Sequence, residues 1–546
     1  MVKKEFDVVV VGAGITGIAA AAYLQKAGLD VAVVERLGEA GPHCMTVESM
    51  EPGAAVNTHV VMGMTGLSPC IEDLDLEKFG LKMIFTPIQY GATFKDGKNV
   101  LIYQDPQKTA ASIARHSEKD AQRYVQIINK IFPEVVDFLK LVLYSPATPD
   151  NLGRIWESIA KYVDMTPQDI VTMNGFEFLD LLFESERVKQ TFMGIASIAY
   201  AGDPCGRGEG IVSVLGIMYF PQGLFQGGSH NLVHALVRCF THHGGTMIYN
   251  SPVERIVVEN GNARGVIISE DSPYPEKEIR ANKAILSNLS APLSLQVIGE
   301  EKVKAADPLL ARRMKDWNMS GESPFMSVWL LRELPRWKSD GWDPEIRGCW
   351  EPYRAWDSWE EAKGWFNLFS NEELWKVVGT VGEVFLTAAG DKTQISPQGH
   401  CILVYEEELP VHLRREGGFE KWDEIKWKIY DRHTEMMEEL APGMKKLILD
   451  RQVHTPLDNW RKNPSAIYGH EFGGDCVGDQ WYMGRLSYRM PIGNLYQINS
   501  AWPIGASFLG SAYVGAGIVA EDLGVRNQPW WNNQPLVWFL KKMGFA

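Results

Sequence analysis

A glycine-rich turn between a strand and a helix constrains the fold more than any other feature of this 546-residue chain. Residues 6–11 read FDVVVV, a β-branched run typical of a buried parallel strand, and Gly12-Ala13-Gly14-Ile15-Thr16-Gly17 follows at once. The Ala-rich stretch after it predicts a helix that ends at Gly28, and DVAVVE predicts a second strand that ends at Glu35. This order indicates the β-turn-α-β unit of a nucleotide-binding α/β domain.

Each glycine of this turn has a separate physical role. Gly12 permits the tight turn, Gly14 lets a pyrophosphate approach the backbone, and Gly17 lets helix and strand pack closely. The free N–H groups of the helix N-terminus would face the phosphates. Glu35 would accept hydrogen bonds from ribose hydroxyls and would repel a 2′-phosphate, and Arg36 beside it is a further candidate for cofactor binding. The alternative is a turn that has lost its ligand.

The loop after the second strand narrows the choice of dinucleotide. Gly38 to Thr46 reads GEAGPHCMT, and here the chain resembles the FAD-binding superfamily of phytoene desaturases, carotenoid isomerases and amine oxidases. In that superfamily this loop wraps the FAD phosphates, so the resemblance implies cofactor contacts at His43 and Thr46. Pro42 stands in place of the second family glycine and His43 in place of the arginine. His43 would give a weaker phosphate contact, or it would be a plain surface loop residue.

Three later segments resemble the same superfamily, in the same order along the chain. They are the run from Pro221 to Leu232, the strand-like segment that contains Val253, and the closing segment from Gly493 onward. The resemblance implies that the Val253 backbone binds adenine and that a loop and a helix N-terminus lie under the flavin. It adds these candidate cofactor-binding residues: Val253, Asn288, Asn499, Ser507 and Phe508. Because the closing loop contains no Cys or His, we expect non-covalent FAD.

The desaturase and isomerase branch fits better than the amine oxidases, on the segments 174–204, 455–456 and 463–469. The resemblance implies an α/β fold in which a Rossmann-type FAD-binding domain is interleaved with an α+β substrate domain. The predicted FAD-binding parts are 1–70, 221–299 and 481–525, and the predicted substrate parts are 71–220 and 300–480. Residues 526–546 form an apolar tail.

The same resemblance implies an FAD-dependent dehydrogenase or desaturase that moves a hydride from an apolar terpenoid or carotenoid-like substrate to flavin N5. Electrons would pass to a quinone, another protein or oxygen. One alternative is a redox-neutral isomerase or hydratase that uses reduced FAD. Another is a non-catalytic FAD-fold subunit or escort. The chain could form a homo-oligomer or a hetero-oligomer with a paralogous subunit.

Candidate proton-handling residues are few. His59 lies where the family shows D-x-G-P beside the flavin, so it is a candidate acid or base, or else a hydrogen-bonded loop histidine. The segment GDPCGRGEG adds Asp203, Arg207 and Glu209, and Tyr219 follows it. For these four residues the alternative is a charged surface loop.

Charge and cysteine content restrict the class of protein. A net charge of −14 with no basic stripe argues against a general nucleic-acid binder. Seven cysteines without a C-x-x-C pair indicate a reducing compartment and no zinc site, rather than a disulfide scaffold, and no metal ligands are predicted. There is no targeting segment and no apolar run of about 18 residues, so we expect a cytoplasmic protein, with peripheral membrane attachment as an alternative.

Two segments have an unusual aromatic content. Nine of the 18 tryptophans lie between Trp317 and Trp375, without a helical or alternating period. They would form an aromatic wall around an apolar substrate, or an aromatic core, lid or interface. The tail over 534–545 is apolar with two lysines, which suits an anchor at a membrane surface or docking on a partner or on the protein's own core.

Overall fold

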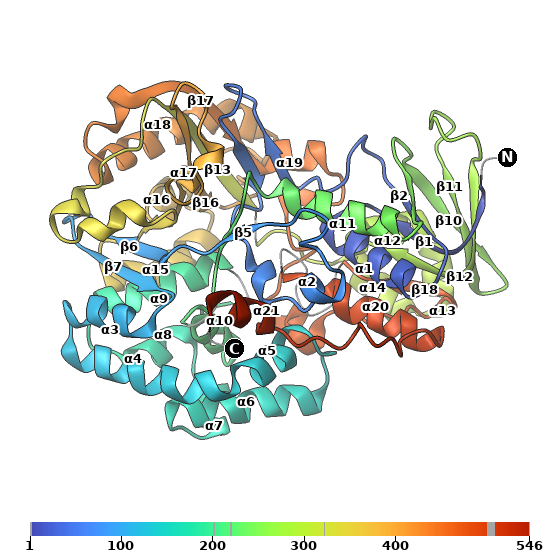
Figure 1. Ribbon diagram of the computed structural model, residues 1–546, viewed down its shortest axis with the longest axis horizontal. Helices are drawn as coiled ribbons and strands as arrows, with labels where there is room; N and C mark the ends of the chain where they lie inside the picture. Colours follow the sequence, from blue (N-terminus) through green and yellow to red (C-terminus); the bar gives the residue numbers. More distant parts are fainter. Residues whose placement is uncertain (1–2, 200–202, 219–220, 322, 500–507, 545–546) are drawn as a thin grey trace.

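Two seven-stranded sheets organise the computed structural model, which describes residues 3–199, 203–218, 221–321, 323–499 and 508–544 (Figure 1). The first sheet has the strand order β10-β11-β12-β1-β2-β9, with β18 paired to β12. Its strands are β1 (Glu5–Val11), β2 (Val31–Val34), β9 (Thr246–Ile248), β10 (Val253–Glu259), β11 (Asn262–Ile268), β12 (Glu278–Ser287) and β18 (Leu495–Gln497). The pairs formed by β1, β2, β9, β12 and β18 are parallel, as a nucleotide-binding sheet requires.

Helices cover this sheet and bury its apolar side chains. The helices packed against it are α1 (Ile15–Lys26), α11 (His230–His242), α12 (Ala291–Ile298), α13 (Glu300–Ala306), α14 (Pro308–Lys315) and α20 (Gly510–Asp522). Helix α1 packs against both α11 and α20. It ends where predicted, because Gly28 takes the positive φ of +94° that stops a helix and that glycine adopts without strain.

The second sheet has the order β17-β13-β16-β15-β14-β6-β7 and lies on the left of Figure 1. Its strands are β6 (Ile88–Thr93), β7 (Asn99–Tyr103), β13 (Pro324–Leu331), β14 (Pro352–Arg354), β15 (Gly382–Phe385), β16 (Cys401–Glu408) and β17 (Ile448–His454). Every residue of the central strands β13 and β16 is buried. Helix α18 (Trp422–Leu440) packs aromatic side chains against one face of these strands, and the side chains of the other face pack in a separate apolar cluster.

The remaining helices and two small ribbons complete the fold. A helical layer below the second sheet in Figure 1 consists of α3 (Pro106–Ala114), α4 (Glu118–Ile131), α5 (Val135–Leu143), α6 (Pro149–Val163), α7 (Pro167–Thr172), α8 (Gly175–Leu182), α9 (Glu186–Ala199) and α10 (Glu209–Ile217). The other α-helices are α2 (Cys70–Asp73), α15 (Trp359–Ser370), α16 (Leu374–Val377), α17 (Thr387–Gly390), α19 (Pro456–Lys462) and α21 (Val537–Met543). The antiparallel ribbons are β3 (Cys44–Val47) with β4 (Val56–His59), and β5 (Met83–Ile84) with β8 (Leu224–Phe225).

The predicted fold class is confirmed. The first sheet draws its strands from residues 5–34, 246–287 and 495–497, and the second from 88–103 and 324–454. The chain therefore passes between the two sheets several times. The residue boundaries of the two domains remain the prediction made from the sequence.

Most tryptophans of the rich segment belong to the core. A set of seven has at most 6% of its surface exposed: Trp317, Trp329, Trp337, Trp350, Trp356, Trp359 and Trp365. Rings in this set meet one another and nearby phenylalanines at distances typical of aromatic packing, as for Trp365 and Phe366 with centroids 5.0 Å apart. The structure therefore supports the interpretation as an aromatic core.

The C-terminal tail docks on the protein itself. Trp538 and Phe539 of α21 are buried, and the Trp538 indole N–H donates a hydrogen bond to Glu77 at 2.9 Å. Lys541 forms an ion pair with Glu72 and Lys542 one with Glu77. Among the described helices, none is long and apolar enough to cross a membrane.

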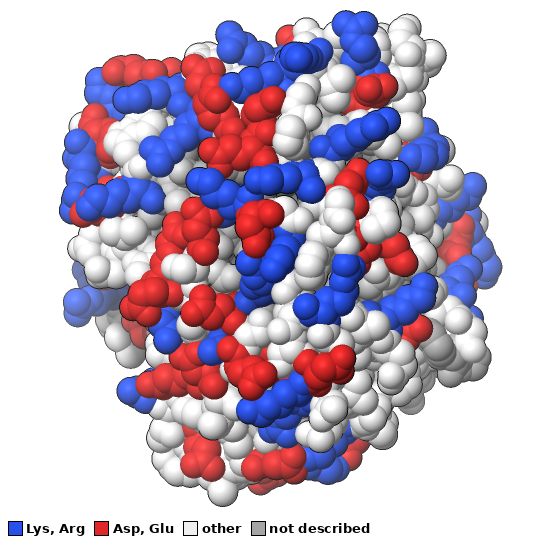
Figure 2. Space-filling view, turned by 90° about the vertical axis from the view of Figure 1, so that its left-hand side faces the viewer, with Lys and Arg blue, Asp and Glu red and all other residues white. Residues whose placement is uncertain are grey.

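Charges of both signs are mixed on the face that Figure 2 shows, where Lys and Arg side chains alternate with Asp and Glu. No continuous basic stripe crosses this face.

Candidate functional site

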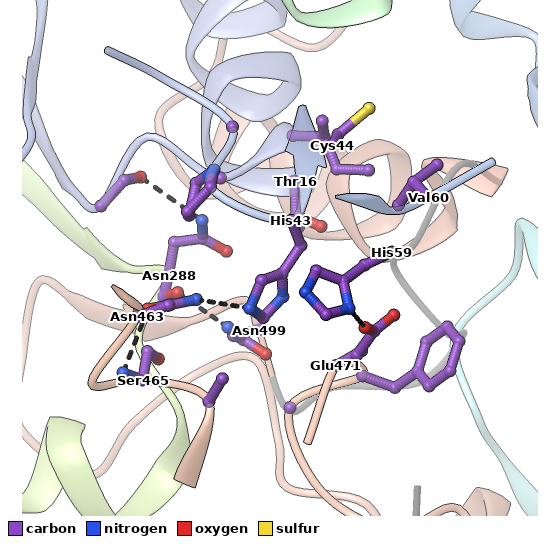
Figure 3. A pocket seen from close by; sticks show the side chains of 18 of the residues that line it. Thr16, His43, Cys44, His59, Val60, Asn288, Asn463, Ser465, Glu471 and Asn499 are labelled. Atoms are coloured by element: carbon purple, nitrogen blue, oxygen red, sulfur yellow. Dashed lines mark hydrogen bonds and ion pairs between the residues drawn. The ribbon is translucent and has the colours of Figure 1, made fainter. Parts of the chain in front are cut away.

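One continuous cavity runs from the glycine-rich turn to the second sheet, and Figure 3 shows the part around its middle. Its nucleotide end is lined by Gly12, Gly14, Thr16, Glu35, Arg36, Val253 and Asn288. Its middle is lined by His43, Cys44, His59, Val60, Glu471, Phe472, Asn499 and Phe508. Its far end is lined by Pro324, Glu383, Phe385, Glu406 and Glu408.

The glycines of the turn leave space for a phosphate-bearing ligand. Gly14 caps α1 without any side-chain hydrogen bond, so the first N–H groups of the helix remain available at the cavity. A Cβ added at Gly14 would lie 2.9 Å from the Asn288 Nδ2 atom. Gly17 does not line the cavity, but a Cβ there would lie 2.4 Å from the Gly12 carbonyl oxygen, so close packing of helix on turn requires glycine.

Glu35 lies at the end of β2, where a ribose would be held. Its carboxylate accepts hydrogen bonds from the backbone N–H groups of Ala13 at 2.7 Å and Leu37 at 2.8 Å. Burial raises its pKa, and these hydrogen bonds oppose the shift. Arg36 lines the cavity and donates to the Lys462 carbonyl. Val253 begins β10 at the cavity wall, at the end where adenine is expected.

The closing segment of the chain brings further predicted cofactor residues to the middle of the cavity, where the flavin is expected. Asn499 donates to the Asn288 carbonyl at 2.8 Å, and Asn288 donates to the Gly12 carbonyl at 3.3 Å, so the closing segment is tied to the glycine turn. Phe508 lines the cavity, and its carbonyl accepts from the Tyr144 hydroxyl. Ser507 lies outside the described residues. These groups fit a bound FAD together with the glycine-rich turn Gly12–Gly17, which leaves space for the phosphates and is called the glycine cradle below.

Two predicted contacts of the phosphate loop differ in their placement. Thr46 does not line the cavity, because its hydroxyl bonds the Asn57 carboxamide oxygen at 2.7 Å and accepts from the His230 N–H at 3.2 Å. His43 does line it, and its Nε2 lies 3.1 Å from the Asn463 amide nitrogen. Burial lowers the pKa of His43 to about 3, so the ring is neutral and offers a phosphate no positive charge.

His59 meets a partner that the sequence did not indicate. It ends β4 with a φ of +69°, a strained conformation for a residue with a side chain, and its Nδ1 contacts a Glu471 carboxylate oxygen. The two side chains point toward each other in Figure 3. Burial, with a smaller effect from Lys462, lowers the pKa of His59 to about 3, and burial raises the pKa of Glu471 to about 7. At neutral pH His59 is therefore neutral and Glu471 is close to its pKa, so Glu471 is the member of the pair that can take up or release a proton.

The remaining predicted catalytic residues lie away from the cavity. Asp203 accepts from the Cys205 N–H at 2.8 Å, and Glu209 accepts from the Gly478 N–H at 3.2 Å. Arg207 is exposed and bonds the Thr172 carbonyl. Tyr219 lies outside the described residues. The structure thus brings His59 to the cavity and does not bring these three described residues there, so their catalytic role remains a prediction without support from their position.

Three carboxyl groups line the far end of the cavity. Glu383 of β15 lies directly opposite Glu406 of β16, and Glu408 faces the same side as Glu406 because side chains alternate along a strand. Burial raises the pKa of Glu383 to about 8, and burial together with mutual repulsion raises the pKa values of Glu406 and Glu408. These carboxyl groups make the far wall of the cavity acidic. No tryptophan of the described chain lines the cavity, so the expected aromatic wall is not observed.

Replacing Glu383 by Gln is expected to stabilise the protein at alkaline pH. A carboxyl group whose folded pKa is raised from 4.5 to about 8 stabilises the fold while protonated, and this contribution is lost as the pH rises through 8. The variant should therefore match the wild type near pH 5 and gain up to about 1.4 kcal/mol for each pH unit up to 8. Thermal unfolding between pH 5 and 9 measures this, with Glu278→Gln on an exposed position of β12 as the control. Parallel curves for Glu383→Gln and wild type would contradict it.

Comparisons with known proteins agree with this geometry. A family model described as an NAD(P)-binding Rossmann-like domain matches residues 10–74. A subunit of limonene dehydrogenase from Castellaniella defragrans is 28% identical, over 97% of this chain and 96% of its own. Hydroxyneurosporene desaturase of Cereibacter sphaeroides is 26% identical, over 50% of this chain and 55% of its own.

The fold also matches a solved flavoprotein structure. A redesigned putrescine oxidase superposes with a TM-score of 0.59 at 13% identity, over 95% of this chain and 99% of its own. At this identity the similarity concerns the fold, which is the FAD-binding fold of amine oxidases. Taken with the glycine cradle and the two-sheet architecture, the similarities assign a flavin cofactor. The chain is thus an oxidoreductase of the FAD-dependent type, similar in sequence to dehydrogenases and desaturases and similar in fold to an amine oxidase.

Proposed function

We propose that this oxidoreductase oxidises a C–H bond of an apolar alicyclic or terpenoid substrate, with hydride transfer to N5 of a non-covalently bound FAD. The observation that carries the proposal is the continuity of the cavity from the glycine cradle, past the His59–Glu471 pair, to the second sheet. Similarity along nearly the whole chain to a protein named as a limonene dehydrogenase chain supports the substrate class. Burial raises the pKa of the Cys44 thiol to about 12, so this cavity cysteine stays protonated and is a poor nucleophile for attachment to flavin.

The protein's part of the chemistry follows from the groups along the cavity. When bound, FAD supplies an acceptor for two electrons and one hydrogen. The His59–Glu471 pair would take up the proton lost from the neighbouring carbon, so that a C–C single bond becomes a double bond. Glu383, Glu406 and Glu408, whose pKa values are raised by burial, would be protonated at neutral pH and would line the far end of the cavity as neutral hydrogen-bonding groups. Because the side chains of His59 and Glu471 are both buried, little water would reach this step.

Anaerobic titration of the FAD-loaded protein with limonene and with a carotenoid tests the proposal. We expect the visible flavin absorption to bleach with at least one of these substrates, and an oxidised product in equal amount. Turnover that requires prior reduction of the flavin and consumes no electrons would instead identify a redox-neutral isomerase or hydratase. A colourless protein that cannot be loaded with FAD would contradict both and favour a non-catalytic subunit.

We further propose that the chain works with a second, different chain and passes its electrons to a quinone, a protein or oxygen. The support for a partner is that the similar limonene dehydrogenase chain is named as one subunit of its enzyme. Activity that appears only when a paralogous chain is added, with a stable complex in gel filtration, would establish it. A cytoplasmic location belongs to the same proposal, because all seven cysteines are free, as in a reducing compartment.

A further inference from the structure

A cluster of side chains that can bind metal lies outside the cavity. It lies between α11 and the loop 38–46 that is expected to wrap the FAD phosphates, called the phosphate loop here. The cluster consists of Glu39, His230 and His234. We propose that these three residues bind one divalent transition-metal ion of the zinc type, with a water molecule as fourth ligand. This inference does not depend on the substrate or on the flavin reaction.

The two histidines are placed to chelate an ion. They are four residues apart on α11, so their side chains project from the same face of the helix, and their rings stack with centroids 4.4 Å apart. One Glu39 carboxylate oxygen lies 3.4 Å from the His230 Nε2 atom and 3.5 Å from the His234 Nε2 atom. All three ligand atoms lie within 4.8 Å of one another.

These separations match a tetrahedral site. Zinc holds His nitrogen and carboxylate oxygen at about 2.0–2.2 Å, which places two ligands of a tetrahedron roughly 3.4 Å apart. The two Glu39 distances already have this length, and the histidine ligand atoms lie within 4.8 Å of each other. Glu39 and His234 are about half exposed, so an ion and its water can reach the open side of the cluster.

The buried member of the cluster gives independent support. His230 is only 7% exposed, and its Nε2 atom has no hydrogen-bond partner although it is buried. An unsatisfied buried nitrogen costs free energy, and a metal ion at this position would remove that cost.

A bound ion would hold the phosphate loop against α11. Glu39 belongs to the loop whose residues Gly41, Pro42 and His43 line the cavity, and the Gly41 N–H donates to the Ala13 carbonyl at 2.9 Å. The ion would thus connect a helix of the FAD-binding sheet to the loop expected to wrap the FAD phosphates. It would be a structural ion, since neither histidine lines the cavity.

Metal binding to the full-length, untagged protein tests the inference. The protein is treated with EDTA, and Zn²⁺ is titrated calorimetrically, while Co²⁺ reports tetrahedral geometry through its visible absorption. All variants carry Cys205→Ser, so that the exposed Cys205 thiol does not bind metal. We expect one Zn²⁺ per chain and an affinity that falls by more than about tenfold in Glu39→Gln and in His234→Ala.

The control is His243→Ala, directly after the last turn of the same helix and outside the cluster, which should bind Zn²⁺ as the parent does. Because Glu39 and His234 are partly exposed, both test variants should unfold at the parent temperature without metal, and this is measured first. Absence of saturable binding at one ion per chain would overturn the inference. So would an affinity that both test variants retain.

Discussion

Replacing Glu471 by Gln is expected to lower the rate of substrate-dependent flavin reduction by about 10²–10⁴-fold, the usual contribution of a general acid or base. The carboxyl group contacts His59 at the middle of the cavity, and burial raises its pKa to about 7. Gln keeps the shape of the side chain but cannot take up a proton. FAD content should stay near that of the wild type, because the ion-pair contact of Glu471 is with His59 and not with the glycine-rich turn.

The pH profile separates a proton-handling role from a structural one. If the deprotonated pair receives the substrate proton, the wild-type rate should rise with pH through about 7, the folded-state pKa of Glu471. This limb should disappear in Glu471→Gln. His59→Asn should lose activity to a similar extent, and Asn is chosen because it tolerates the positive φ of +69° at this position. Since the two residues act as one pair, the double variant should be no slower than the slower single variant.

A second histidine–glutamate pair offers a matched control. His400 and Glu51 lie 2.9 Å apart, but neither lines the cavity. Glu51→Gln and His400→Ala should therefore leave the rate of flavin reduction and its pH profile unchanged. If the flavin of Glu471→Gln is reduced by substrate at the wild-type rate and with the same dependence on pH, the His59–Glu471 pair has no part in the chemistry. Stopped-flow absorbance under anaerobic conditions measures all of these variants.

The nucleotide half of the site could be predicted because its determinants are local in sequence. Gly12, Gly14 and Glu35 lie within one β-turn-α-β unit, and the geometry of such a unit places them at one cavity end. Val253 and Asn288 lie far along the chain, and the resemblance to a known family supplied their place. Thr46 shows the limit of that reasoning, since its hydroxyl is engaged by Asn57 and the backbone of His230.

The residues that line the substrate half of the cavity could not be predicted, because the order of the strands in the second sheet brings them together from distant parts of the sequence. The run Glu406-Glu407-Glu408 indicates two faces of a strand, yet only the pairing of β16 with β15 shows that Glu383 lies opposite Glu406. Glu471 reaches His59 from a loop that lies far along the sequence. The tryptophans pointed to an apolar wall, but large aromatic side chains are equally suited to a core, and that is where seven of them lie.

Replacing Gly17 by Ala is expected to abolish stable retention of FAD. The added Cβ would lie 2.4 Å from the Gly12 carbonyl oxygen and 2.8 Å from Asn288 Nδ2, distances that atoms in a folded protein do not adopt. Since Gly12 is backbone of the turn itself, a side-chain rotation cannot relieve the contact, and α1 must move away from the turn. Such overpacking costs about 1–3 kcal/mol of stability. The same movement displaces the N–H groups that are expected to hold the pyrophosphate, so FAD affinity should fall at least about tenfold.

Gly153→Ala provides the control for this substitution. Gly153 also lies within a helix, α6, but a Cβ added there meets no atom within 4 Å. Ala is the better helix former, so this variant should keep its FAD and gain about 0.5–1 kcal/mol. Flavin content after gel filtration and FAD titration of the apoprotein measure both variants. Wild-type FAD affinity in Gly17→Ala would show that the turn adapts without loss, and the cradle would then have to be located elsewhere along the cavity. Loss in Gly17→Ala with retention in Gly153→Ala assigns the cofactor to the first turn of α1, because the two substitutions differ only in what the added methyl group meets.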